Sequence, residues 1–276
     1  MAGRQAEQVS SGDLLRQARK SRRLSQLDLA LRVGASQRHL SFVETGRSRP
    51  SREMVLRLAE TLEVPLRGQN AMLVAAGLAP QYPERSLDEP ALAPARRVID
   101  MILKGHEPFP ALAVDRRWNL VAHNEAVGPF LTGVSPELLA PPANVLRLSL
   151  HPQGLAPRIV NLAEWKAHLL ERLRDQHAAS GDAELLALRD ELQAYPAPEP
   201  AAELRDYGGI TVPMVIEADG RRLSFLSTTT VFGTPVEVTL SEIAIEAFFP
   251  ADEATAAALT PSPSHLPSAG GSLPLP

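Results

Sequence analysis

The sequence predicts an α+β protein of two domains, in which an all-α domain of five helices precedes a mixed α/β domain. Three observations lead to this prediction. The length of 276 residues suits about two domains. A proline-rich stretch over 80–94 separates short helical patterns from mixed strand and helix patterns. Residues 1–79 hold 13 Lys/Arg and 7 Asp/Glu, a net charge of +6, whereas residues 80–276 carry a net charge of −10.

We therefore expect a first domain over 12–79, a proline-rich linker over 80–94 and a second domain over 95–250. The remaining residues, 251–276, begin with a short alanine-rich segment and continue mainly with Pro, Ser and Gly. These residues bury too little apolar surface to order themselves, so we expect a mostly disordered tail.

The composition restricts the class of protein. A chain that is 44% hydrophobic and 22% charged can bury a core, which excludes a wholly disordered protein. The lack of cysteine excludes disulfides, thiolate metal sites and cysteine nucleophiles. The longest nearly apolar stretch, Ala71–Ala79, is too short to span a bilayer, and the N-terminus resembles no secretory signal. We therefore expect a cytoplasmic protein with no membrane partner.

The opposite charges of the two parts indicate different partners. A basic small domain joined to a larger acidic one favours a polyanion as the partner of the first domain only. The alternative is chance unevenness on two solvated surfaces.

The first two predicted helices follow from apolar spacing and capping residues. The first carries the apolar stripe Leu14, Leu15, Ala18 and Leu24. Ser25 opens the second with a capping-box-like pattern, in which Asp28 stands where Glu or Gln is more usual. We expect the buried face of this helix to consist of Leu27, Ala30, Leu31 and Val33, with Gly34 as the left-handed residue after its end.

Three more helices are predicted from the same signals. Ser36 caps a third helix over Gln37–Thr45, which Gly46 stops. Ser51 caps a fourth, and Pro65 opens a fifth. The apolar residues of these last two helices recur at spacings of three and four, and include Met54, Val55, Leu58, Ala59, Leu62, Met72, Leu73 and Ala76.

The second and third helices, joined by the turn Val33–Ser36, form a helix-turn-helix pattern. The third helix points polar side chains outward at its start, namely Gln37, Arg38, His39 and Ser41. Arg forks onto guanine, and Gln pairs with the edge of adenine. The basic flank with Arg47 and Arg49, and the helix start at Ser51, suit backbone phosphates.

Residues 25–64, SQLDLALRVGASQRHLSFVETGRSRPSREMVLRLAETLEV, resemble the DNA-binding domain of the phage-repressor, Cro-like (XRE) family. The resemblance implies a repressor-like fold, double-stranded operator DNA as partner, a phosphate clamp at Gln26 and base readers at Gln37, Arg38 and Ser41. Phe42 stands where related repressors often have a polar reader, and one option is an apolar contact with a thymine methyl group. The full set of expected DNA contacts is Ser25, Gln26, Ser36, Gln37, Arg38, His39, Ser41, Phe42, Arg47, Arg49 and Ser51. The alternative is a helical domain that binds protein only.

The second domain has strand and helix patterns in sequence. Ala111–Asp115 and Trp118–Ala122 flank a turn, and Asn124 is expected to cap a following helix. Two amphipathic helices are predicted over Asn161–Ala178 and Asp182–Tyr195, and then a hairpin and a long strand bent near Ser241. The hairpin consists of Thr211–Glu217, the turn Asp219–Gly220 and Leu223–Val231, and the last strand covers Pro235–Phe249. A sheet with helices inserted midway can enclose an apolar cavity.

Residues 110–126, 144–170 and 227–259, which include the stretches PALAVDRRWNLVAHNEA and NVLRLSLHPQGLAPRIVNLAEWKAHLL, resemble the MmyB-like ligand-binding domain of bacterial transcription regulators. The resemblance implies a PAS-like fold, a sensor role and a fatty-acid-like ligand. The candidate ligand-binding residues are Asn124, His151, Arg158, Trp165 and Phe225, the first three as donors to a head group. The domain's apolar residues are expected to be core rather than cavity wall: Leu112, Val114, Leu120, Phe130, Leu146, Trp165, Phe225 and Phe232.

Motifs for catalysis are missing from the sequence. It has no G-x-S-x-G, H-E-x-x-H, P-loop or G-x-G-x-x-G pattern. His168 and His177 are nine residues apart and need a partner such as His151 to share a metal, so we expect neither metal nor cofactor. The prediction is a homodimeric one-component transcription regulator that is not an enzyme. The alternatives are a hydrolase-like enzyme with a DNA-binding head, and an antitoxin-like regulator whose second domain binds a protein.

Overall fold

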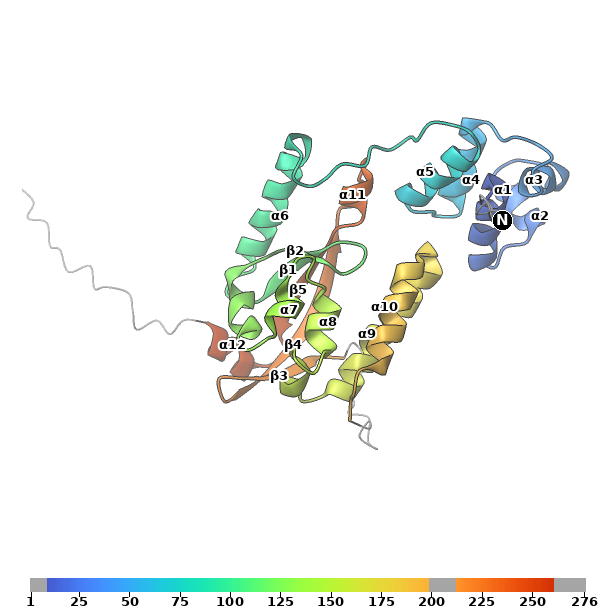
Figure 1. Ribbon diagram of the computed structural model, residues 1–276. Coiled ribbons are helices and arrows are strands. Elements are labelled where there is room, and N and C mark those ends of the chain that lie inside the picture. The colour runs from blue at the N-terminus through green and yellow to red at the C-terminus, as the bar shows by residue number, and fades with distance from the viewer. Residues whose placement is uncertain (1–8, 199–211, 261–276) are drawn as a thin grey trace, which may run out of the picture.

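The computed structural model describes residues 9–198 and 212–260, and its chain forms a small helical domain and a larger mixed domain (Figure 1). The small domain, called the head below, contains the five expected helices. They are α1 Ser11–Ser21, α2 Gln26–Arg32, α3 Gln37–Glu44, α4 Arg52–Thr61 and α5 Leu66–Ala75.

Serine side chains cap the first four helices of the head. Ser10, Ser25, Ser36 and Ser51 each accept a hydrogen bond from the backbone N–H three residues later. The Asp28 carboxylate also accepts a hydrogen bond from the backbone N–H of Ser25, which confirms the capping box. The caps at Ser25, Ser36 and Ser51 are those that the sequence predicts, whereas the Ser10 cap was not predicted.

The buried face of α2 differs from the prediction at Leu27 and Leu31, whereas Ala30 and Val33 are buried as predicted. Leu29 and Ala30 are fully buried, whereas Leu27 and Leu31 are 49% and 71% exposed. Leucine occupies every second position of this seven-residue helix, so spacing alone does not determine which side packs inward. Contact with the core residues Leu40 and Leu58 of α3 and α4 fixes that choice.

The proline-rich linker makes specific contacts with both domains. The Asn70 side chain on α5 accepts from the backbone N–H of Gln81 and Tyr82 and donates to the Tyr82 carbonyl. Further along, the Arg85 N–H donates to the Glu237 carboxylate at 2.7 Å. The end of the predicted linker is helical, since a short 3-10 helix η1 (Pro90–Leu92) leads directly into α6 (Ala93–Gly105).

The described residues of the second domain form a five-stranded antiparallel sheet in the order β2-β1-β5-β4-β3. Its strands are β1 Ala111–Val114, β2 Leu120–His123, β3 Met214–Ala218, β4 Arg221–Val231 and β5 Ala244–Pro250. The β3–β4 hairpin turns through Asp219 and Gly220, both with positive φ, as the Asp-Gly pair predicts. Thr211, expected to begin this hairpin, lies outside the described residues.

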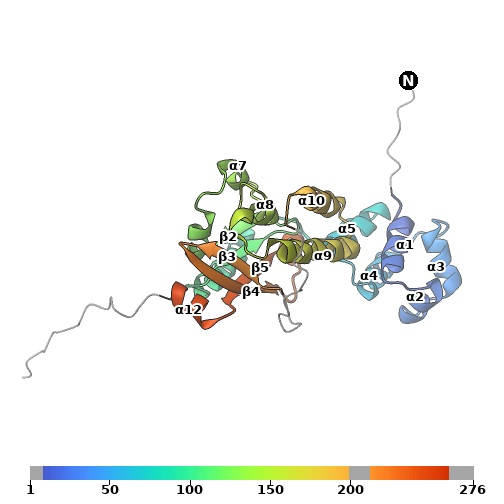
Figure 2. The ribbon, with the colours of Figure 1, turned by 90° about the horizontal axis from the view of Figure 1, so that it is seen from below.

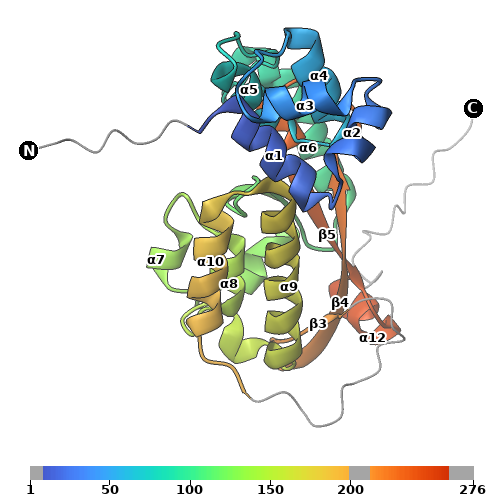
Figure 3. The same ribbon diagram turned by 90° about the vertical axis from the view of Figure 1, so that its right-hand side faces the viewer.

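The chain between β2 and β3 is mostly helical. Its elements are η2 Glu125–Leu131, α7 Pro136–Leu139, α8 Val145–Leu150, η3 Ala156–Arg158, α9 Leu162–Ser180 and α10 Ala183–Ala194. The predicted helix pair corresponds to α9 and α10, which lie side by side over the sheet (Figure 3). Figure 2 shows the same pair from below, beside α8.

The segment 235–249 is not one bent strand, as expected, but a short helix α11 (Val238–Ser241) followed by β5. The buried carboxylate of Glu237 accepts from the N–H of Leu240 and thereby caps α11. The alanine-rich start of the predicted tail also folds, as α12 (Glu253–Leu259), against β4 and β5. Residues 261–276 lie outside the described residues.

The pleat of the central strands sorts side chains between two cores. On β1 and β5, Ala113 and Ile245 pack with Ile99 and Leu103 of α6. Their neighbours Leu112 and Phe248 point to the opposite face and pack with the core beneath α8 and α9. That second face holds the cavity described below.

Candidate nucleic-acid interface and ligand cavity

The start of α3 presents polar side chains on the surface of the head. Gln37 and Arg38 are exposed, and His39 and Ser41 are half-buried. Leu40, 1% exposed, anchors the opposite side of the helix. The Ser36 hydroxyl accepts from the His39 N–H and so fixes where this first turn begins. The turn therefore offers both donors and acceptors to a groove.

Phe42 supports the position of Arg38. The Arg38 guanidinium carbon lies 5.4 Å from the centre of the Phe42 ring, one helical turn away. A cation near an aromatic face is attracted by the ring quadrupole. The half-buried Phe42 thus restricts the long Arg38 side chain.

Glu44 at the end of α3 is 2% exposed and holds α1, α2 and α3 together. Arg19 donates to it from Nε at 2.6 Å and from Nη2 at 2.9 Å. Gln26 adds a bond from Nε2 at 2.8 Å. Burial raises the pKa of Glu44, but the bonds from Arg19 and Gln26 outweigh it, so the pKa is below the ordinary value.

The bond to Glu44 also limits which atoms of the Gln26 side chain are available to a DNA phosphate. Its amide nitrogen is committed to Glu44, and its side chain is half-buried at the first turn of α2. The sequence analysis did not predict the pairing of Glu44 with Arg19. The signal for Arg19 was its position one turn after Leu15, on the buried side of α1.

Exposed cations flank α3. Arg47 and Arg49 follow the helix in an exposed loop before the Ser51 cap of α4. In the described part of the head, the salt bridges involve Arg16, Arg19, Arg22 and Arg67 but neither of these residues nor Arg38. Side chains without an internal partner remain able to neutralise phosphates.

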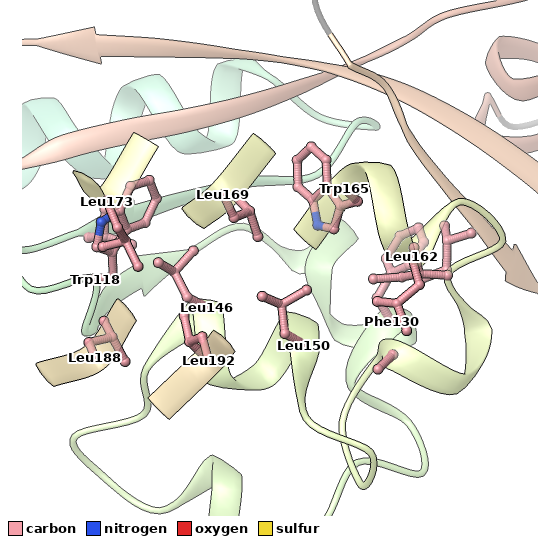
Figure 4. Packing of buried hydrophobic residues seen from close by; sticks show 14 of the residues in the cluster. Trp118, Phe130, Leu146, Leu150, Leu162, Trp165, Leu169, Leu173, Leu188 and Leu192 are labelled. Carbon is pink, nitrogen blue, oxygen red and sulfur yellow. The ribbon is translucent and has the colours of Figure 1, made fainter. Parts of the chain in front are cut away.

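An apolar cavity of about 100 Å³ lies in the second domain between the sheet and α8 and α9. Its walls include both tryptophans of the chain, Trp118 and Trp165. Figure 4 shows Trp165 and Leu169 of α9 above Leu146 and Leu150 of α8. The uncharged lining also includes Leu146 and Leu169, together with Pro110, Leu112, Leu120, Val127, Phe130, Leu131, Val145, Leu148, Leu155, Met214, Phe225 and Phe248, and the serines Ser149 and Ser227.

The cavity changes the expectation for the apolar residues singled out from the sequence. Six of them line it: Leu112, Leu120, Phe130, Leu146, Trp165 and Phe225. Val114 belongs to the adjoining core, and Phe232 packs on the α6 side of the sheet. Sequence spacing identifies buried positions but cannot show where side chains from different elements leave a space.

Asn124 does not line the cavity. It is 5% exposed, and its amide accepts from the Ala111 N–H and donates to the carbonyls of Leu103 and Phe109. It precedes the 3-10 helix η2 but makes no side-chain capping bond to it. Its amide therefore joins β1 to the end of α6 and is not placed to bind a head group.

His151 and Arg158 also lie away from the cavity wall. The His151 ring packs edge-on against Tyr195, and its Nδ1 accepts from the Gln153 N–H. Arg158 donates to the Phe130 carbonyl. These contacts stabilise the loops around η2 and η3. Neither residue lines the cavity.

The charged residues on the cavity wall are Arg172 of α9 and Glu246 of β5, which the sequence analysis missed. Arg172 donates from Nη1 at 3.0 Å and from Nη2 at 2.6 Å to the two Glu246 oxygens. Its guanidinium carbon also lies 4.5 Å from the centre of the Trp118 ring. A signal was available, because a glutamate within the apolar stretch Ala244–Phe248 needs a buried partner.

Two family descriptions match the chain. "Helix-turn-helix" matches residues 15–69, and "MmyB-like transcription regulator ligand binding domain" matches residues 95–260. Comparison with curated proteins gives no match. Among the described residues, no helix is long and apolar enough to cross a membrane.

The two matches coincide with the two features of the structure. The first covers the helix-turn-helix with its exposed α3, and the second covers the sheet, the helices and the cavity, over more than half of the chain. The protein is a DNA-binding transcription regulator with a ligand-binding domain, and it belongs to the MmyB-like family of these regulators.

Proposed function

We propose that this protein is a bacterial one-component regulator that binds a two-fold operator as a homodimer. The exposed polar start of α3 and the unpaired Arg47 and Arg49 support direct readout combined with phosphate contacts. A dimer of such domains contacts half-sites about one helical turn, roughly 10 bp, apart or a multiple of it. Bacterial operator DNA lies in the cytoplasm, so the proposal includes a cytoplasmic location.

The ligand in this proposal has a fatty-acid-like acyl chain and occupies the cavity. The main support for an acyl chain is that the cavity wall is almost entirely apolar and consists of side chains from both the sheet and the inserted helices. This arrangement, an antiparallel sheet with helices inserted between β2 and β3, also supports the PAS-like assignment. The proposal includes no catalytic step.

Ligand binding then changes the affinity for DNA. The coupling is reciprocal, so a ligand that weakens operator binding tenfold is itself bound tenfold less tightly by the DNA complex. A change in the relative orientation of the two heads would spoil the half-site spacing.

The experiment titrates acyl compounds of increasing chain length, both fatty acids and their methyl esters, into the full-length protein. Both tryptophans line the cavity, so their fluorescence reports occupancy directly. Each added methylene contributes about 0.8 kcal/mol, so Kd should fall about fourfold per methylene until the cavity is full. The titration is repeated with an operator selected from random duplex DNA. Binding that ignores chain length, or an operator affinity unchanged at ligand saturation, would contradict the proposal.

A further inference from the structure

The charges in the cavity wall neutralise each other. Glu246 is 3% exposed, and both of its oxygens bind Arg172. Thr229 completes the cluster, because its hydroxyl accepts from Arg172 Nη2 at 2.7 Å and donates to Glu246 at 2.9 Å. A face of the guanidinium is covered by Trp118. The only cation on the cavity wall, among the described residues, therefore already has its counter-ion.

This arrangement disfavours an ionised acid in the cavity. A carboxylate loses its hydration when it enters an apolar site, and it needs an available cation to compensate. Next to Arg172 it would also lie close to the Glu246 carboxylate, and two like charges at one site disfavour the ionised state of both. The charge pair thus offers little net attraction to an anion.

A neutral donor is present on the same wall. Ser149 of α8 is 8% exposed, and its oxygen accepts from Trp165 Nε1 at 3.0 Å. Among the hydrogen bonds of the described residues, its own hydroxyl hydrogen has no acceptor. A hydroxyl whose hydrogen is available for donation suits a ligand that brings an oxygen acceptor.

We propose that the natural ligand is an uncharged amphiphile, an acyl chain whose polar group is an ester-, ketone- or amide-type carbonyl, and that Ser149 donates to this carbonyl. This inference rests on the ligand-sensing function proposed above. It specifies the head group, which the shape of the cavity leaves open.

The first test compares dodecanoic acid, methyl dodecanoate and undecane at neutral pH and below the concentration at which the acid forms micelles. Tryptophan quenching of the full-length protein gives the three Kd values. The ester should bind about tenfold or more tightly than the acid, because only the acid loses the hydration of an ion. Equal or tighter binding of the acid overturns the inference but leaves the sensing function intact. No binding of any of the three compounds contradicts the sensing function itself.

The second test changes the charge balance with Glu246→Gln, which is nearly the same size. Arg172 then becomes available to an anion, so the affinity for dodecanoic acid should rise about tenfold, while that for the ester stays within about twofold. Glu217→Gln is the matched control, because Glu217 lies exposed on β3 outside the cavity. An unchanged preference in a Glu246→Gln protein with a wild-type circular dichroism spectrum contradicts the charge argument.

The third test leaves the charge pair intact, so it can still test the proposal if the Glu246→Gln variant fails to fold. Ser149→Ala should weaken methyl dodecanoate binding about fivefold, the loss of one hydrogen bond. Undecane, which has no acceptor, should bind the wild type and this variant alike. If the ester and undecane lose affinity equally, Ser149 only shapes the wall and the proposed donor role is wrong.

Discussion

Glu44 illustrates how one buried carboxylate organises the head. It accepts hydrogen bonds from Arg19 and Gln26, and it ends the helix that begins with the candidate base readers. Removing one member of a buried pair leaves the other charge without compensation, which costs more than the pair contributes net. The position of α3 therefore depends on a residue that we do not expect to contact DNA.

The first prediction is that Glu44→Gln lowers the free energy of unfolding of the head by about 3–5 kcal/mol. Urea denaturation followed by far-ultraviolet circular dichroism measures the change, since both tryptophans are in the other domain. Glu60→Gln, an exposed position on α4, is the control and should be nearly neutral. Equal stabilities of the two variants would contradict the structural role of Glu44.

The same residue predicts a pH dependence. The pKa of Glu44 in the folded state is below its ordinary value of 4.5, so its stabilising contribution is complete above that value. It is lost as the pH falls through the lowered folded-state pKa. The stability difference between the wild type and Glu44→Gln should therefore shrink on acidification below about 4.5. A difference that stays constant there would show that Glu44 is not ionised in the folded head.

The second prediction separates base readers from phosphate contacts. Arg38→Ala should cost about 1–3 kcal/mol on the specific operator and relax the preference at one position. Arg49→Ala should weaken binding to all sequences about equally and reduce the salt slope by about one unit. Binding titrations at several salt concentrations on specific and random DNA provide both quantities. If both variants lose only non-specific affinity, Arg38 is not a base reader.

At the scale of elements, the contact between α1 and α3 depends on a glycine. A Cβ at Gly12 would lie 2.6 Å from the Glu44 carbonyl oxygen and 2.7 Å from that of Val43. These neighbours are backbone atoms that cannot rotate away. The two helices approach so closely because position 12 carries no side chain.

The third prediction is that Gly12→Ala destabilises the head by about 1–3 kcal/mol through overpacking. Gly105→Ala is the control, because a Cβ at the last residue of α6 meets nothing within 4 Å. Thermal unfolding by circular dichroism compares the two variants. A melting temperature for Gly12→Ala equal to that of the control would mean that α1 can shift without loss.

At the scale of the whole molecule, an ion pair connects the head to the ligand-binding domain. Arg67 of α5 donates from Nε at 2.7 Å and from Nη2 at 2.9 Å to Glu242, next to α11. Figure 1 shows α5 beside α11 at this junction. Glu242 precedes β5, the strand that also carries Glu246 of the cavity wall. The short segment from Glu242 into β5 thus joins the contact with the head to the ligand site.

The fourth prediction is that Arg67→Ala reduces the effect of ligand on operator affinity while the ligand Kd of the DNA-free protein stays within about twofold. Arg189→Ala, on α10 and away from both the head contact and the cavity wall, should retain the full coupling. Operator titrations with and without saturating methyl dodecanoate measure the effect. Full coupling in Arg67→Ala would exclude this contact as the connection.

The fifth prediction concerns the linker. A fragment of residues 1–83 should be more stable than residues 1–79, because only the longer one keeps the bonds between Asn70 and residues 81–82. Both fragments should bind the operator far more weakly than the whole chain if the ligand-binding domain supplies most of the dimer interface. Circular dichroism and operator titration test the two parts. Full-length affinity in either fragment would place the dimer interface in the head.

Elements whose causes are local could be predicted from the amino-acid sequence. Serine caps and left-handed glycines act within a few residues, so the five head helices and the Asp219–Gly220 hairpin turn were predictable. The two domain types were recognisable from residue patterns for the same reason. Three features became apparent only in the folded chain: the buried side of α2, the break at α11 and the ion pair on the cavity wall. Those features depend on residues far apart in the chain, as when Arg172 meets Glu246, and local spacing carries no information about which distant side chains meet.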